Sequence, residues 1–102
     1  MQRLYQMVRA ADARFPDGVE PFQMVTRLLE ECGEVAREVN HWEGSGIKRQ
    51  KHGEPSKERL ADELRQSMVA LMQIAVYYSV ERELEMSMAA SLENSRAEGL
   101  ID

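Results

Sequence analysis

The chain has 102 residues, of which 43% are hydrophobic and 30% charged, and its net charge at pH 7 is −5. A length and composition of this kind predict a single globular domain over residues 1–102, and one cysteine excludes an intrachain disulfide. The acidic balance argues against nucleic acid as a partner, and no apolar run is long enough to span a membrane. Since the N-terminus lacks the apolar segment of a signal peptide, we expect a cytoplasmic location.

The first half of the chain predicts two helices. One runs from about Gln2 to Arg14 and stops at the turn sequence FPDGVEP. The next runs from about Pro21 to Trp42, and at 100° per residue its apolar positions fall within an arc of about 140°, which is typical of a core-facing helix. These apolar residues are Met24, Val25, Leu28, Leu29, Cys32, Val35, Ala36 and Val39. We therefore expect Cys32 to be a small buried hydrophobe without chemistry of its own.

A basic connection follows the second helix. Residues 47–59, IKRQKHGEPSKER, hold five basic and two acidic residues, net +3, whereas the rest of the chain holds eight basic and sixteen acidic residues, net −8. Long connections inside small domains tend to be functional or disordered. The pattern fits an acidic body that binds a cation and a basic loop that binds phosphates, and the alternative is a solvated connecting loop.

The second half of the chain predicts two more helices. The third starts near Ser56, a suitable N-cap, and continues to about Val80. Its stretch from Met68 to Tyr78 is apolar on nearly all sides, so we expect it to pack against a second copy of the chain. The fourth runs from about Glu83 to Ala97. Together these elements predict an all-α fold that resembles a four-helix bundle.

Acidic residues flank the apolar arc of the second helix, in the sequence LLEECGEVAREVN. Glu31, Glu34 and Glu38 share a face because their offsets are three, four and seven. On the third helix, Glu63 and Gln66 share a face with Ala70, whose small side chain leaves space beside them. Carboxylate and amide oxygens on two facing helices form the kind of site that holds Mg²⁺ or Mn²⁺.

Glu38 and His41 also form a Glu-x-x-His pair, the spacing that di-iron bundles use. Such bundles need two pairs, and the other histidine, His52, follows a glycine-punctuated loop. We therefore expect His41 to be an exposed or capping residue near the end of the helix rather than a ligand.

Two motifs carry a resemblance to a known family. LLEECGEVAREVN, followed about thirty residues later by ADELRQSMVALMQIA, resembles the EExxE and ExxD motifs of the MazG-like, all-α nucleoside triphosphate pyrophosphohydrolases. The resemblance covers about residues 20–96. It implies a helical bundle that forms a dimer or a dimer of dimers and uses Mg²⁺ to convert nucleoside triphosphates to monophosphates and pyrophosphate.

The resemblance also implies roles for single residues. Glu31 and Glu34 match metal ligands of the first motif, and Glu63 matches the glutamate of the second. Gln66 stands where the family has an aspartate ligand, so the site has one negative charge fewer. Glu30 or Glu34 would orient or deprotonate the water that attacks the α-phosphorus.

Substrate contacts complete the expected site. The basic residues of the loop would hold the distal phosphates, Trp42 or Phe22 would stack on the base, and the resemblance places a nucleotide contact at Asn94. The loop residues concerned are Lys48, Arg49 and Lys51. Two alternatives remain open: a catalytically degenerate relative that binds nucleotide or a protein partner, and a purely structural helical oligomer.

Overall fold

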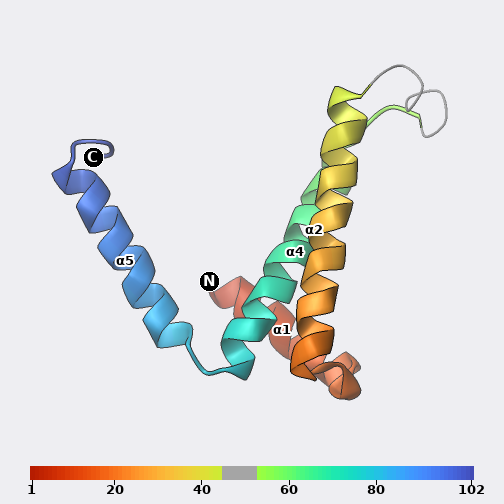
Figure 1. Cartoon of the computed structure of the whole chain (residues 1–102), viewed down its shortest axis with the longest axis horizontal. Helices are drawn as coiled ribbons and strands as arrows, with labels where there is room; N and C mark the ends of the chain where they lie inside the picture. Colours follow the sequence, from red (N-terminus) through yellow and green to blue (C-terminus); the bar gives the residue numbers. More distant parts are fainter. Residues whose placement is uncertain (45–52) are drawn as a thin grey trace.

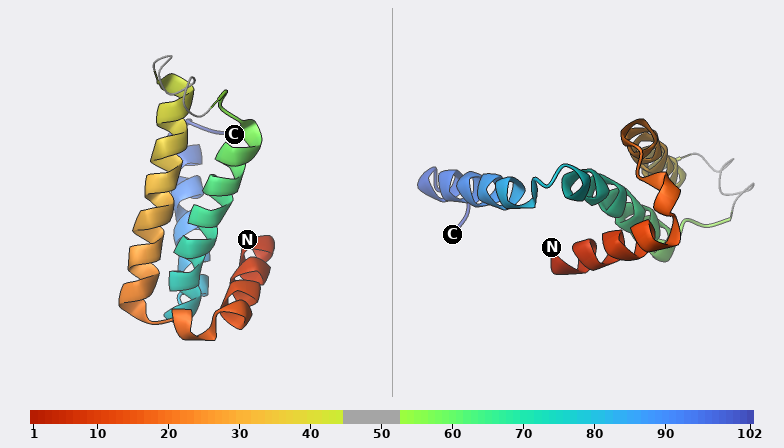
Figure 2. Two further views of the ribbon diagram at one scale, coloured as in Figure 1. Left: turned by 90° about the vertical axis from the view of Figure 1, so that its right-hand side faces the viewer. Right: turned by 90° about the horizontal axis from the view of Figure 1, so that it is seen from below.

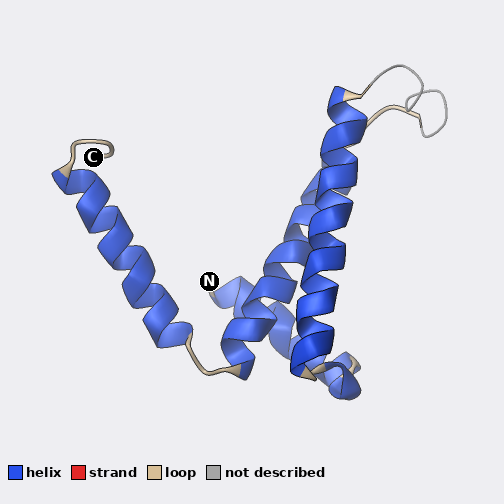
Figure 3. Ribbon diagram, viewed as in Figure 1, coloured by secondary structure: helices blue, strands red, loops and turns tan. Residues whose placement is uncertain are grey.

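The structure is a computed structural model, and it describes residues 1–44 and 53–102. All regular structure within these residues is helical, which confirms the predicted all-α bundle class (Figure 3). The elements are α1 (Gln2–Arg14), a single 3-10 turn η1 (Pro16–Gly18), α2 (Pro21–Glu43), α4 (Lys57–Tyr77) and α5 (Glu81–Ala97).

The start of α2 is fixed by local chemistry. The Glu20 carboxylate accepts hydrogen bonds from the backbone N–H groups of Phe22 and Gln23, at 3.2 and 3.0 Å. Pro21 occupies the first helical position, where its missing N–H leaves no hydrogen bond unmade. The predicted position of Pro21 is therefore confirmed.

The start of α4 is fixed by Ser56, which is the N-cap that the sequence predicts. Its hydroxyl oxygen accepts a hydrogen bond from the backbone N–H of Arg59 at 3.2 Å, and the hydroxyl donates to the Glu58 carboxylate at 3.0 Å. Hydrogen bonds from the backbone N–H of Glu58 and from Ser56 lower the pKa of the Glu58 carboxyl below its usual value. Both contacts favour the negative charge at the positive end of the helix dipole.

The end of α4 comes earlier than predicted. The helix stops at Tyr77, because Ser79 adopts a left-handed backbone conformation with φ of 56°. The N–H groups of Ser79 and Val80 then turn back onto the carbonyls of Val76 and Ala75, at 3.1 and 3.0 Å. These bonds satisfy the last turn of α4. They also let α5 begin two residues before its expected start.

The helices form a hairpin with two attachments (Figures 1 and 2). α2 and α4 run antiparallel, α1 packs on α4 at the end of the hairpin where α2 begins and α4 ends, and α5 diverges from the hairpin so that the chain has the outline of a V. The radius of gyration is 17.0 Å, whereas a compact chain of this length has about 13 Å. A single copy is therefore less compact than a typical globular domain of this length.

The apolar core is small and lies where α1 crosses α4. Val8, Met72 and Ala75 are its buried members, and half-buried apolar side chains surround them. The surrounding residues are Leu4, Tyr5, Val69, Val76 and Leu84. α5 joins the core only through Leu84, and beyond that residue all its apolar side chains are exposed. α5 therefore leaves most of its apolar surface in water.

The apolar arc of α2 does not face the core as predicted. Met24 is buried and Leu28 and Val35 are half-buried, but the greater part of the arc is exposed, so the expected burial of Cys32 is wrong. The exposed members are Val25, Leu29, Cys32, Ala36 and Val39. The physical reason is that α2 contacts α4 through the edge that carries its glutamates, which turns the apolar arc outward.

A polar network joins α1, η1, α2 and α4. Gln73 of α4 is buried, accepts a hydrogen bond from Arg27 Nη1 at 2.7 Å and donates one to the Asp12 carboxylate at 2.6 Å. Arg27 Nη2 also donates to the Gly18 carbonyl at 3.0 Å. A Cβ at Gly18 would lie 2.9 Å from Arg27 Nη2, so a larger residue here would displace the guanidinium group. One amide thus connects three helices and a turn.

We predict that Gln73→Leu lowers the free energy of unfolding by about 2 kcal/mol, since it leaves the Arg27 guanidinium and the Asp12 carboxylate without their shared partner. Urea unfolding followed by circular dichroism measures the change. Gln6→Leu, the same exchange at an exposed position of α1, is the control and should alter stability by less than about 0.5 kcal/mol. Equal stabilities of the two variants would contradict the role of Gln73.

Candidate functional site

The surfaces that α2 and α4 turn toward each other are unusually polar. Glu31 is half-buried and Glu38 is buried on α2, and both lie on one helix face because they are seven residues apart. On α4 the half-buried residues Glu63, Gln66 and Ser67 share a face because Gln66 and Ser67 follow Glu63 by three and four residues. Four of the predicted polar side chains, those of Glu31, Glu38, Glu63 and Gln66, are thus at least half-buried on two helices that pack together.

Three oxygen atoms in this region lack partners. The Oε2 atoms of Glu31 and Glu63 and the Oγ atom of Ser67 are buried, and no group in residues 1–44 and 53–102 hydrogen-bonds to them. A buried carboxylate oxygen without a partner costs several kcal/mol, so it needs a cation or a proton. Carboxylate and hydroxyl oxygens are ligands that suit a hard cation, and the donor set therefore fits Mg²⁺.

A cavity of about 900 Å³ opens between α1, η1, α2 and α4, and of these three residues only Glu31 lines it. Glu31 and Gln66 both line it, and the space expected beside Ala70 is part of it. The remaining lining residues are Ala11, Arg14, Phe15, Pro16, Asp17, Gly18, Arg27, Arg65, Val69 and Gln73. Its volume lies in the range of about 300 to 1,000 Å³ that small-molecule sites occupy.

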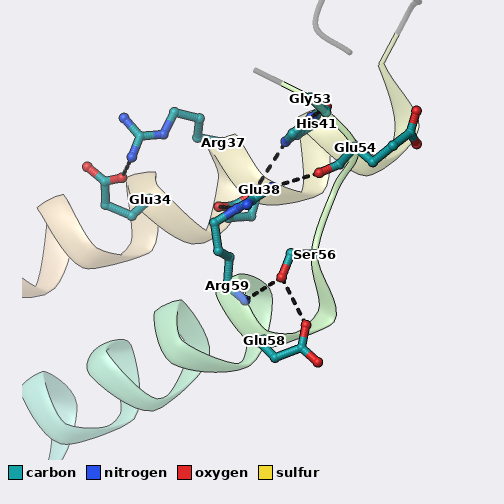
Figure 4. Close-up of polar contacts among 9 residues, drawn as sticks. All are labelled: Glu34, Arg37, Glu38, His41, Gly53, Glu54, Ser56, Glu58 and Arg59. Carbon is teal, nitrogen blue, oxygen red and sulfur yellow. Dashed lines mark hydrogen bonds and ion pairs between the residues drawn. The ribbon is translucent and has the colours of Figure 1, made fainter.

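The other glutamates of the first motif point elsewhere. Glu30 is exposed and lines a separate shallow hollow with Phe22 and Thr26. Glu34 is half-buried and forms an ion pair with Arg37 of the next helical turn (Figure 4). Within the described part of the chain, no three histidine, cysteine, aspartate or glutamate side chains form a group that could hold a metal ion.

The structure therefore contains fewer candidate cation ligands than the first motif predicts. Two carboxylates carry unpartnered oxygens, Glu31 and Glu63, and neutral oxygens of Gln66 and Ser67 lie on the same face of α4 as Glu63. Such a set leaves several coordination positions for water or substrate oxygens, as Mg²⁺ usually requires.

Glu38 and His41 belong to a different cluster, at the far end of the hairpin (Figure 4). His41 lies in the last turn of α2, as expected, but of the two expected roles the exposed one is wrong, because the side chain is buried and its Nε2 donates to the Gly53 carbonyl at 2.7 Å. The Glu38 carboxylate lies 3.8 Å from His41 Nδ1 and 3.5 Å from Arg59 Nε. Arg59 Nη2 also donates to the Glu54 carbonyl at 2.8 Å. This cluster ties the end of α2 to the segment before α4.

The predicted substrate contacts are spread widely. Trp42 is half-buried near the end of α2, with no partner for its buried Nε1 among the described residues, and Asn94 is exposed on α5. Phe22 is exposed at the start of α2. The basic loop residues lie outside the described residues; they are Lys48, Arg49 and Lys51. A single copy thus brings neither Trp42 nor Asn94 to the cavity, because neither residue lines it.

The sequence reasoning missed the arginines of the cavity. Arg14, Arg27 and Arg65 line it from α1, α2 and α4, one from each helix. The charge pattern along the chain could not reveal them, because they are far apart in sequence and gather only through the packing of three helices. Ser67 was also missed, although its offset of four from Glu63 places both on one helix face.

Comparison of the chain with models of protein families, with curated proteins and with solved structures found no match. No helix among residues 1–44 and 53–102 has the length and apolar character needed to cross a membrane. Any functional conclusion therefore depends on the residues themselves.

We predict that millimolar Mg²⁺ or Mn²⁺ raises the melting temperature, because a cation relieves the unpartnered oxygens of Glu31 and Glu63. At ten times the dissociation constant, mass action adds about 1.4 kcal/mol of stability, or about 5 °C for a domain of this size. Differential scanning calorimetry with and without EDTA measures the shift.

Glu31→Gln should abolish the metal-dependent rise, whereas Glu43→Gln, at the exposed end of α2, should preserve it. Without metal, Glu31→Gln should be at least as stable as the parent, because it removes a partly buried negative charge. Melting curves of the parent that do not respond to either ion would count against the site.

Proposed function

We propose that the protein is a Mg²⁺-dependent nucleoside triphosphate pyrophosphohydrolase, which releases a nucleoside monophosphate and pyrophosphate. The observation that carries the proposal is the pair of buried, unpartnered carboxylate oxygens of Glu31 and Glu63 on facing helices. Gln66, one turn after Glu63, lies on the wall of the adjoining cavity with Glu31. The resemblance of the two motifs to those of MazG-like enzymes supports the same conclusion.

Glu31 and Glu63, with the Gln66 amide oxygen, are the residues that would hold Mg²⁺. When bound there, the ion supplies positive charge that offsets the negative charge of the substrate phosphates. Glu34 lies one turn from Glu31 on α2 and forms an ion pair with Arg37. Glu34, or Glu30 as the exposed alternative, accepts a proton from the attacking water. The water oxygen bonds to the α-phosphorus, the bond to the bridging oxygen breaks, and pyrophosphate leaves.

A second candidate is favoured by one residue, Gln66. Because an amide replaces the carboxylate of the second motif, the cation site carries only two full negative charges on Glu31 and Glu63. A catalytically degenerate protein that binds nucleotide or a protein partner with the same helices would have this feature. Its distinguishing property is binding without release of pyrophosphate.

We predict that the parent releases pyrophosphate from at least one ribo- or deoxynucleoside triphosphate with Mg²⁺, and that Glu63→Gln lowers kcat by about a hundredfold or more. Gln66→Asp should bind Mg²⁺ more tightly, because it adds a negative charge to the site, although the aspartate side chain is one methylene shorter. Its rate should at least equal that of the parent. A coupled pyrophosphate assay and calorimetric titration with Mg²⁺ measure the two properties.

Glu43→Gln is the matched control for the loss of a carboxylate and should keep the parent rate. If the parent releases no pyrophosphate from any nucleoside triphosphate, with Mg²⁺ or with Mn²⁺, the result would contradict the enzyme and favour the catalytically degenerate protein. Equal Mg²⁺ affinities of the parent and Gln66→Asp would show that the second motif is not a ligand pair here.

We also propose that the protein works as a homodimer or a homotetramer. The exposed apolar residues of α2 include Val25 and Leu29, and those of α4 include Leu64, Met68 and Leu71. Each set lies about 100° round its helix from the polar contact line, in the same rotational sense. Because the helices are antiparallel, both sets lie on one side of the hairpin. This side, which we call the apolar side, carries at least these five exposed large apolar residues, and such a grouping is typical of a protein interface.

We predict that sedimentation at micromolar concentration gives at least twice the chain mass of 11.7 kDa, because packing of the apolar sides of two copies removes them from water. Leu29→Glu, at a position that is 68% exposed in the single chain, should shift the protein toward the monomer. Leu100→Glu, at a position that is 71% exposed in the C-terminal tail, is the control and should not. A clean monomer for the parent would contradict the proposal.

A further inference from the structure

The cavity beside Glu31 has a cationic wall in a chain that is acidic overall. Arg14, Arg27 and Arg65 line it, against the carboxylates of Asp17 and Glu31. Arg65 is half-exposed, and its ion pair with Asp62 is long, at 3.9 Å. Arg14 makes no hydrogen bond or ion pair with any of the described residues. Two guanidinium groups are thus available to a ligand at the wall of the cavity.

The third guanidinium is held in place in advance. Arg27 uses one donor on the buried amide of Gln73, at 2.7 Å, and one on the Gly18 carbonyl, at 3.0 Å. A guanidinium has five donors, so three remain for other acceptors. Close approach of Gly18 and the bond to Gln73 fix the group before any ligand arrives, which reduces the entropy lost on binding.

We propose that this cavity binds the phosphate chain of a polyphosphate, with Arg14, Arg27 and Arg65 as its cationic contacts. Planar guanidinium groups match phosphate oxygens bidentately, and three of them around one cavity suit a ligand with several phosphates better than a single carboxylate. The inference rests on the proposed function, because the phosphate chain is the part of a nucleoside triphosphate that would lie beside Glu31. It assigns phosphate binding to the helices rather than to the basic loop.

Glu31 gives the proposal a signature that depends on metal. Its carboxylate lines the same cavity, so without a cation it repels a bound phosphate chain. With Mg²⁺ on Glu31 the sign of this interaction reverses, because the ion attracts both groups. Glu31→Gln should therefore tighten polyphosphate binding in EDTA and weaken it in Mg²⁺.

The test is calorimetric titration of the full chain with inorganic tripolyphosphate in EDTA, at fixed ionic strength. Arg14→Gln and Arg65→Gln should each weaken binding about fivefold, since each removes one charge-assisted contact. Arg9→Gln is the matched control: it removes the same charge from an exposed position of α1 outside the cavity. Because positions 14 and 65 are exposed, circular dichroism should show that all three variants keep the parent fold.

Selective weakening in Arg14→Gln and Arg65→Gln supports the proposal. If Arg9→Gln weakens tripolyphosphate binding equally, the effect comes from net charge and the proposal is wrong. The absence of measurable tripolyphosphate binding to the parent would also contradict it. If the parent releases no pyrophosphate but binds tripolyphosphate in a way that depends on Arg14 and Arg65, the proposed activity is wrong and the phosphate site is supported.

Discussion

The contact between α2 and α4 is the constraint from which the rest of the structure follows. It buries oxygens of Glu31 and Glu63 without partners, where helix pairs normally bury apolar side chains. Because the acidic edge of α2 faces inward, the apolar arc must face outward, and residues such as Leu29 remain in water. Each side of the hairpin is therefore unsatisfied in its own way. In the proposed function, the inner side binds a cation and the apolar side binds a second copy of the chain.

Gln73 connects this contact to the cavity. Its amide holds Arg27 on one side and Asp12 on the other, so the α1–η1 segment closes over the end of the hairpin where Arg27 lies. A hydrocarbon side chain at this position would allow α1 to pack on α4 but would leave the guanidinium without a fixed direction. The two hydrogen bonds of Gln73 thus stabilise the fold and also hold the Arg27 guanidinium group at the cavity.

The sequence predicts the helices well because their signals are local. Ser56 and Pro21 mark helix starts through contacts within one turn, and both positions are confirmed. Periodicity gives the angle between the apolar arc and the glutamates, but it cannot say which of the two faces the neighbouring helix, so the expected burial of Cys32 failed. The arginines of the cavity were beyond sequence reasoning for a related reason. Their proximity comes from the meeting of three helices.

Gln66 makes physical sense when the cation site and the cavity are considered together. A carboxylate at this position would add a third negative charge on the wall that also carries Glu31, which favours metal binding but repels a phosphate chain. An amide keeps an oxygen ligand without that repulsion. In the proposed site, two carboxylates would balance one divalent ion, and the neighbouring guanidinium groups of Arg27 and Arg65 would contact phosphates whose charge the ion offsets only in part. With the neutral Gln66 amide as a ligand, the arginines therefore contribute more of the phosphate binding and the metal less. This arrangement suits a site with a single ion.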